Sequence, residues 1–154
     1  MMIILILVTI FSETREKTSM KKLAIEAPVE LRVEASVNPS ESPEKVIIAV
    51  ENVIGCFPEL RYGTRVTARS HGYESLRTIY DQVRSRSIMG VLRRVLLYNR
   101  AANGTWFLLN KQAAVVGIVA VSEVEQESPL GPIRVNLECK ELGSLIDWLV
   151  PTEY

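Results

Sequence analysis

The stretch VELRVEASV, residues 29–37, decides the fold of this chain, because apolar and polar residues alternate along its whole length. A period of two is typical of a β-strand with one face against the core and the other face in solvent. Residues 133–139, IRVNLEC, repeat the pattern near the C-terminus. These two segments predict a half-buried sheet.

The segments around these strands read mostly as helices. Ser42 and Pro43 supply an N-cap and a first helical residue for a helix that runs to about Ile54, where Gly55 ends it. Apolar stripes at helical spacing predict further helices near 73–83, 88–99 and 142–149. Weaker strand patterns occupy 61–69, 105–109 and 117–121. Since the late strands are joined by short connections, we predict an α+β fold of two layers, a mainly antiparallel sheet with helices packed on one face.

The N-terminal segment is set apart from this pattern. Residues 1–11 are apolar but too few to span a bilayer, and no basic residues precede them as in a signal peptide. Met20 offers a second start. We therefore expect residues 1–19 to be an appendage or an over-called start, and residues 20–154 to form a single α+β domain in the cytoplasm without a membrane partner.

The stretch from Leu109 to Val135 contains a stiff Ser-Pro-Leu-Gly-Pro turn, residues 128–132, followed by a strand. Lys111 and Gln112 are expected at a strand end, where their polar side chains can reach solvent or a ligand. Lys111 is the one residue of this stretch for which the sequence predicts a functional role.

The charge of the chain is unevenly distributed although its formal net charge is zero. Between Leu60 and Lys111 there are ten basic and two acidic residues, a local surplus of eight positive charges. Nine of the ten are arginines, whose planar guanidinium group matches phosphate and stacks on bases. The candidate RNA-binding residues are Arg61, Arg65, Arg69, Arg77, Arg84, Arg86, Arg93, Arg94, Arg100 and Lys111.

The spacing of some of these arginines predicts where they point. Arg86, Arg93 and Arg100 recur every seven residues, which places them on one stripe if a single helix carries all three. Arg77 and Arg84 share that spacing and are expected to face solvent. Such a basic face attracts a polyanion with strong salt dependence. Tyr62, Tyr73 and Trp106 are candidate stacking groups, although residues of this kind more often serve core or surface packing.

Two further function classes stay open beside RNA binding. In the first, a protein-interaction or self-associating module such as a homodimer, the basic middle pairs with acidic flanks of a partner. The second is an enzyme, and the sequence gives it little support. His71 is the only histidine, Cys56 and Cys139 lack metal-ligand spacing, and no phosphate-binding or nucleophile motif is present. We expect neither catalysis nor a cofactor or metal.

Three stretches carry a family resemblance: residues 110–114 with Gly117, residues 127–133, and residues 146–149 with Pro151. They resemble a small archaeal family of uncharacterised proteins, with Val150 standing where the family has alanine. The likeness runs from about Val29 to Pro151. The family is similar in fold to the large-subunit ribosomal protein that binds 5S ribosomal RNA. The resemblance therefore implies a two-layer antiparallel fold and a role with RNA, which could be ribosomal.

Overall fold

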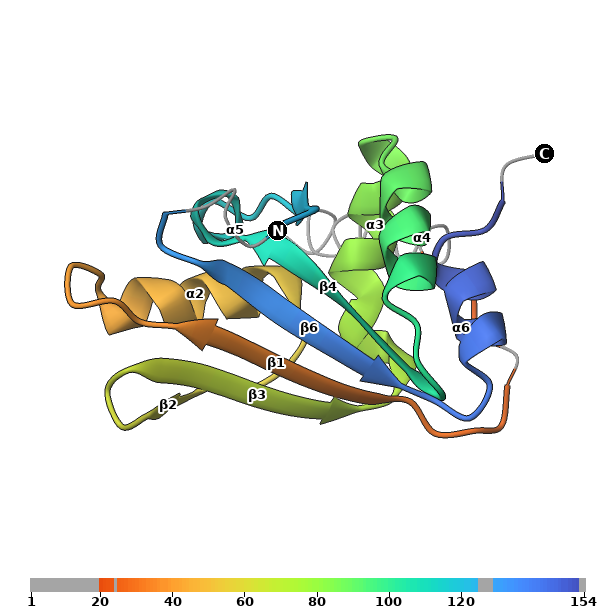
Figure 1. Cartoon of the computed structure of the whole chain (residues 1–154), viewed down its shortest axis with the longest axis horizontal. Coiled ribbons are helices and arrows are strands. Elements are labelled where there is room, and N and C mark those ends of the chain that lie inside the picture. Colours follow the sequence, from red (N-terminus) through yellow and green to blue (C-terminus); the bar gives the residue numbers. More distant parts are fainter. Residues whose placement is uncertain (1–19, 24, 125–128, 153–154) are drawn as a thin grey trace, which may run out of the picture.

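The computed structural model describes residues 20–23, 25–124 and 129–152. The predicted appendage, residues 1–19, lies outside them. Within the described part, five α-helices and a short 3-10 helix accompany a six-stranded antiparallel sheet with the order β2-β3-β1-β6-β4-β5 (Figure 1). The predicted α+β class is confirmed.

The strands and helices are short and interleaved along the chain. The strands are β1 (Glu30–Ser36), β2 (Glu59–Arg61), β3 (Arg65–His71), β4 (Gly104–Asn110), β5 (Val121–Ser122) and β6 (Pro132–Glu138). The helices are α2 (Pro43–Val53), the 3-10 helix η1 (Tyr73–Leu76), α3 (Arg77–Ser85), α4 (Met89–Tyr98), α5 (Lys111–Val115) and α6 (Leu142–Leu149).

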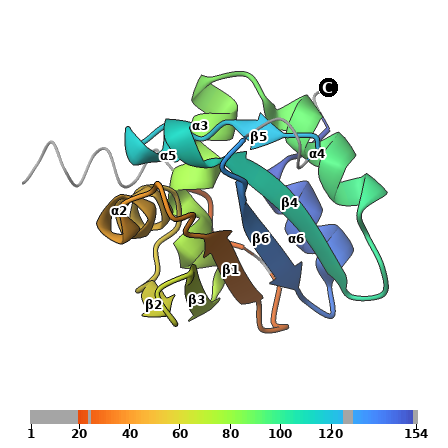
Figure 2. The same cartoon turned by 60° about the vertical axis from the view of Figure 1, so that its left-hand side comes forward.

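The two alternating stretches of the sequence pair with each other at the centre of the sheet. In the β1–β6 ladder Val33 lies opposite Val135 and Leu31 opposite Leu137, and all four side chains are buried. Their polar neighbours point to the other face, which the helices leave uncovered (Figures 1 and 2). Burial of one face alone is therefore the physical cause of the alternation.

The core lies between the sheet and the helices. Four of the described helices contribute an apolar stripe to it, since their buried residues recur at helical spacing. The stripes are Val46, Ala49, Val50 and Val53 on α2; Ile79, Tyr80 and Val83 on α3; Leu92 and Leu96 on α4; and Leu142, Leu145, Ile146 and Leu149 on α6.

Two predicted strands are wrong in detail. The segment 61–69 is a hairpin of β2 and β3, because Tyr62 (φ 56°) and Gly63 (φ 70°) adopt the left-handed conformation of a tight turn. The expected strand at 117–121 is reduced to β5. Lys111–Val115 forms the short helix α5 instead of leading into that strand, and the Asn110 side chain caps α5 by accepting from Ala113 N.

The corner before β6 agrees with the sequence. Gly131 has φ 85° and Pro132 is the first residue of β6, as predicted, while Ser128 lies outside the described residues. In the described part of the chain, no helix is long and apolar enough to cross a membrane.

Candidate nucleic-acid interface

The uncovered face of the sheet carries a group of arginines that the strands hold side by side. Arg32 comes from β1, Arg65 and Arg69 from β3, and Arg134 from β6. Each occupies a polar position of its strand, so the pleat turns its side chain away from the helices. We call this surface, with Arg61 of β2 and Trp106 of β4, the open sheet face.

The strand register places Arg32 directly opposite Arg69 in the β1–β3 ladder. Two like charges at such a position destabilise a sheet unless an anion lies between them. Among the described residues neither guanidinium forms an ion pair, although Glu30 and Glu34 flank Arg32 on the same strand face. Arg32 and Arg69 are therefore a pair of cations without a counter-charge of their own.

Two other arginines of the open sheet face, Arg61 and Arg65, have carboxylate partners near them, and those contacts are exposed. Arg65 lies 3.7 Å from Glu34, and Arg61 lies 3.1 Å from Glu59. In each pair both side chains are at least 44% exposed. Exposed pairs of this kind contribute roughly 0–1 kcal/mol, so a phosphate can displace the carboxylate at little cost.

Arg134 is held in a different way. Its Cζ lies 4.2 Å from the centroid of the Trp106 ring, and its Nε donates to Asn136 Oδ1 at 3.3 Å. A guanidinium over an indole face is a favourable cation–π contact. The two contacts fix the orientation of this side chain.

The open sheet face is concave. A hollow of about 900 Å³ is lined by the five sheet arginines, by Glu34 and Glu59, and by the exposed aromatic residues Phe57 and Tyr62 near its edge. A second hollow of about 400 Å³ adjoins it and includes Trp106, Asn103 and Gly104. With five arginines against two glutamates, the larger hollow is positively charged.

The remaining predicted arginines do not join this face. Arg77, Arg84, Arg93 and Arg94 come from α3 and α4, on the helix side of the molecule, where Arg94 pairs with Glu123. The expected stripe of Arg86, Arg93 and Arg100 on one helix is wrong. Arg86 lies in the turn before α4, where Ser87 adopts φ 56°, and Arg100 lies beyond the end of α4. Arg86 and Arg100 are exposed.

Arg84 and Arg93 were expected on a solvent-facing surface, and instead they cap α6. Arg84 donates to the carbonyls of Trp148 and Leu149 at 3.1 and 3.0 Å, and its Cζ lies 3.3 Å from the Tyr80 ring centroid. Arg93 donates to Val150 O at 2.9 Å and pairs with Asp147 at 2.8 Å. The last carbonyls of a helix have no partner within it, so cations bind there. Burial lowers the pKa of Arg84 somewhat despite the opposing effect of Tyr80 and Asp81.

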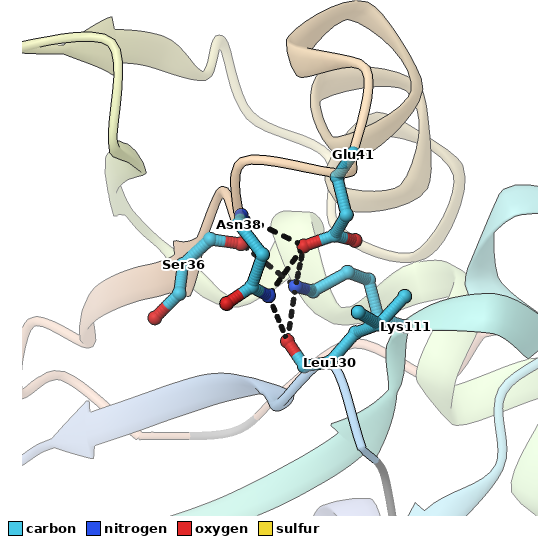
Figure 3. A network of polar contacts seen from close by, with 5 residues as sticks. All are labelled: Ser36, Asn38, Glu41, Lys111 and Leu130. Carbon is cyan, nitrogen blue, oxygen red and sulfur yellow. Dashed lines mark hydrogen bonds and ion pairs between the residues drawn. The ribbon is translucent and has the colours of Figure 1, made fainter.

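Lys111 also differs from expectation, because its side chain is 2% exposed. Figure 3 shows its ammonium group among three oxygens: Ser36 O at 2.7 Å, Leu130 O at 2.8 Å and Glu41 Oε1 at 2.9 Å. The expectation that this side chain can reach solvent at a strand end is wrong. A buried ammonium needs such partners, and here they join the end of β1, the loop before α2 and the corner before β6.

Asn38 completes this network. Its backbone N and its Nδ2 donate to Glu41 Oε1 at 3.0 and 2.7 Å, and Nδ2 also donates to Leu130 O at 2.8 Å (Figure 3). Burial acts to raise the pKa of the Glu41 carboxyl, but the hydrogen bonds from Asn38 and Lys111 outweigh it, so the pKa is lowered. Glu41 is therefore charged at neutral pH, and its contacts with Lys111 and Asn38 serve the fold.

Two aromatic candidates occupy different environments. Tyr73 packs edge-on against Trp148, with ring centroids 5.3 Å apart, on the helix side. Tyr62 is 96% exposed in the β2–β3 turn. Of the three aromatic residues named from the sequence, Tyr62 and Trp106 thus belong to the open sheet face and Tyr73 does not.

Sequence reasoning missed Arg32 and Arg134, because both lie outside the segment between Leu60 and Lys111 in which the basic surplus was counted. The signal that could have found them is the alternation itself. Each is a polar residue in one of the two strongest strand patterns, and polar positions of neighbouring antiparallel strands share one face.

Comparison with known proteins places this architecture in a family. A family model described as RNA binding matches residues 30–139. A UPF0201 protein of Methanothermobacter thermautotrophicus is 42% identical over 123 residues, which cover 79% of this chain and 90% of that protein. The chain belongs to the archaeal UPF0201 family. Its resemblance in fold to the ribosomal protein stays a prediction.

Other UPF0201 proteins agree in sequence and in fold. The protein of Sulfurisphaera tokodaii is 40% identical over 124 residues, covering 77% of this chain and 85% of that one. A crystal structure of the UPF0201 protein from Methanococcus jannaschii matches with a TM-score of 0.68 and 26% identity, covering 81% of this chain and 95% of that one. A second UPF0201 crystal structure, at 24% identity, has a TM-score of 0.70 and covers 80% and 94%. The family model suggests RNA binding, and the solved structures show the shared fold.

Proposed function

We propose that this chain binds RNA on its open sheet face, with Arg32 and Arg69 holding the phosphate backbone. The observation that carries the proposal is the register of β1 and β3, which sets these two guanidinium groups opposite each other without a carboxylate partner in the described chain. A phosphate oxygen between them relieves their repulsion and accepts charge-assisted hydrogen bonds from both. The RNA-binding family model spans both residues.

The surroundings of the pair support a polyanion as the ligand. The positively charged hollow continues from Arg69 across β1 to Arg134, so several phosphates of one strand can lie along it. Binding of this kind releases counterions and weakens steeply as salt rises. The exposed arginines Arg86 and Arg100, which line neither hollow, are not required by this proposal.

The binding role involves no catalytic step. His71 is exposed at the end of β3, and its nearest carboxylate partner is Glu30 at 3.9 Å. Burial, followed by the charge of Glu51, raises the pKa of the Cys56 thiol to about 11, so the thiol is protonated at neutral pH and is a poor nucleophile. Neither group lies in a setting that activates it.

The test compares two double charge reversals of equal size by fluorescence anisotropy with labelled RNA across a salt series. Arg32→Glu with Arg69→Glu is expected to lower RNA affinity at least tenfold and to reduce the salt slope by roughly 0.7 for single-stranded RNA, the value for the one phosphate that lies between the two arginines. Arg86→Glu with Arg100→Glu changes the net charge equally at exposed residues that line neither hollow, and it serves as the control.

The control variant is expected to lose little affinity. If both double variants lose affinity to the same degree, the effect is one of overall charge and the open sheet face is not the interface. If the unaltered protein fails to bind RNA at low salt, RNA binding itself is wrong.

A second candidate function, self-association, is favoured by the β2 edge of the sheet. β2 is an edge strand of three residues, and Phe57, Leu60 and Tyr62 around it are 94%, 41% and 96% exposed. An uncovered strand edge can pair with a second chain. Light scattering without nucleic acid distinguishes this candidate: a dimer that Leu60→Lys disrupts supports it, and a monomer at all concentrations removes it.

A further inference from the structure

Further contacts hold Trp106 and Arg134 in the cation–π pair that they form on the open sheet face. Arg134 lies over the indole face and donates to Asn136 as well. Trp106 is anchored through its backbone, whose carbonyl accepts from Asn99 Nδ2 at 3.0 Å. The Arg134 guanidinium is thus held over the indole before any ligand arrives, which reduces the entropy lost on binding.

The pair lies at the boundary of the two hollows of the open sheet face. Arg134 lines the larger hollow with the arginines, and Trp106 lines the smaller one, while Asn136 lines both. The ladders connect the pair to the phosphate-binding arginines: Trp106 is opposite Asn136, Asn136 is opposite Arg32, and Arg32 is opposite Arg69. Three strand spacings, about 14 Å, separate Arg69 from Trp106.

We propose that Trp106 and Arg134 form a stacking platform for one unpaired nucleobase, so that the RNA recognised by this face is single-stranded. The inference rests on the proposed function, because the phosphates of the same strand must lie on Arg32 and Arg69. Single-stranded bases stack on aromatic rings and on guanidinium planes. In a duplex the neighbouring base pairs cover both faces of each base, so only the bases at the duplex ends are accessible to such a platform.

The chemistry of the surrounding groups fits a base better than another phosphate. The guanidinium of Arg134 lies over the ring and uses its Nε–H on the Asn136 amide oxygen, so its outer side is left for a planar group and its terminal N–H groups can bond the edge of a base. The side chain of Asn136 supplies amide groups beside it that can bond the edge of a base. Arg32 and Arg69, in contrast, have no such support among the described residues and keep their donors for phosphate.

The experiment compares three labelled RNAs of one length by anisotropy: a single strand, the same strand with abasic ribose at its central positions, and a perfect duplex. The unaltered protein is expected to prefer the base-containing strand over the abasic one and over the duplex. Trp106→Leu is expected to lower affinity for the base-containing strand by roughly 5- to 150-fold, the range for loss of one stacked base, and to leave affinity for the abasic strand unchanged.

A second variant keeps the test independent of any effect on folding. Arg134→Lys retains the charge but loses the planar surface, so it is expected to reduce the preference for bases while abasic binding stays as it was. Arg69→Lys makes the same chemical change at a proposed phosphate contact and is expected to alter both strands by the same factor. Circular dichroism checks that each variant is folded.

The outcomes separate the two proposals. Equal affinity of the unaltered protein for base-containing and abasic strands, or for duplex and single strand, overturns the stacking platform and leaves RNA binding in place. Equal losses for both strands in Trp106→Leu and Arg134→Lys do the same. Failure to bind any of the three RNAs overturns both proposals.

Discussion

Replacing Lys111 by methionine is expected to destabilise the fold by about 3 kcal/mol and to leave RNA affinity unchanged. The methionine keeps most of the buried aliphatic stem but removes the ammonium group. The carbonyl of Ser36 then loses its hydrogen bond from Lys111, and Glu41 loses its counter-charge. The change therefore isolates the polar network from the packing around it.

The magnitude follows from the geometry. Removing one partner of a buried ion pair costs roughly 3–5 kcal/mol. The lower end applies here, because Glu41 is 10% exposed and keeps two hydrogen bonds from Asn38. For a chain of this size each kcal/mol shifts the midpoint of thermal unfolding by about 2–4 °C, so the melting temperature should fall by about 6–12 °C.

Urea unfolding of a double-mutant cycle measures the effect. The cycle consists of Lys111→Met, Glu41→Gln and the double variant. The loss of unfolding free energy in the double variant should be smaller than the sum of the two single losses by about 1–3 kcal/mol. A loss below about 1 kcal/mol for Lys111→Met, with no coupling to Glu41, would refute the burial argument. A fall in RNA affinity of the folded Lys111→Met variant would show that Lys111 contributes to RNA binding.

Three further predictions concern ionisation and capping. Because folding lowers the pKa of Glu41, the stabilising contribution of this carboxylate is complete above its unfolded pKa and is lost as pH falls through its folded pKa. Below about pH 4.5, the urea midpoint of the unaltered protein should therefore fall more steeply with decreasing pH than that of Glu41→Gln. Arg84→Ala should cost about 1.5–3 kcal/mol in urea unfolding, since it frees the last carbonyls of α6. Cys56, with its pKa near 11, should react with iodoacetamide slowly at pH 7.5 and faster as pH rises; fast labelling at pH 7.5 would contradict its burial.

The sequence by itself determined the class of fold. Alternation in residues 29–37 and 133–139 reports burial of one face, and the apolar stripes of the helices report the complementary surface that covers it. Both signals are local, because each repeats within a few residues and can be recognised without knowledge of the tertiary contacts. The exposed face of the sheet, and with it Arg32 and Arg134, was implicit in the same alternation.

Tertiary structure alone decided which cations are available to a ligand. Arg84 and Arg93 look like their exposed neighbours in the sequence, but the end of α6 lies beside them and supplies carbonyls. Lys111 is buried because three distant segments close around it. The register of β1 and β3 then brings Arg32 opposite Arg69, from positions far apart in the chain. A charged side chain is free or engaged according to its neighbours in space, and no local pattern encodes those neighbours.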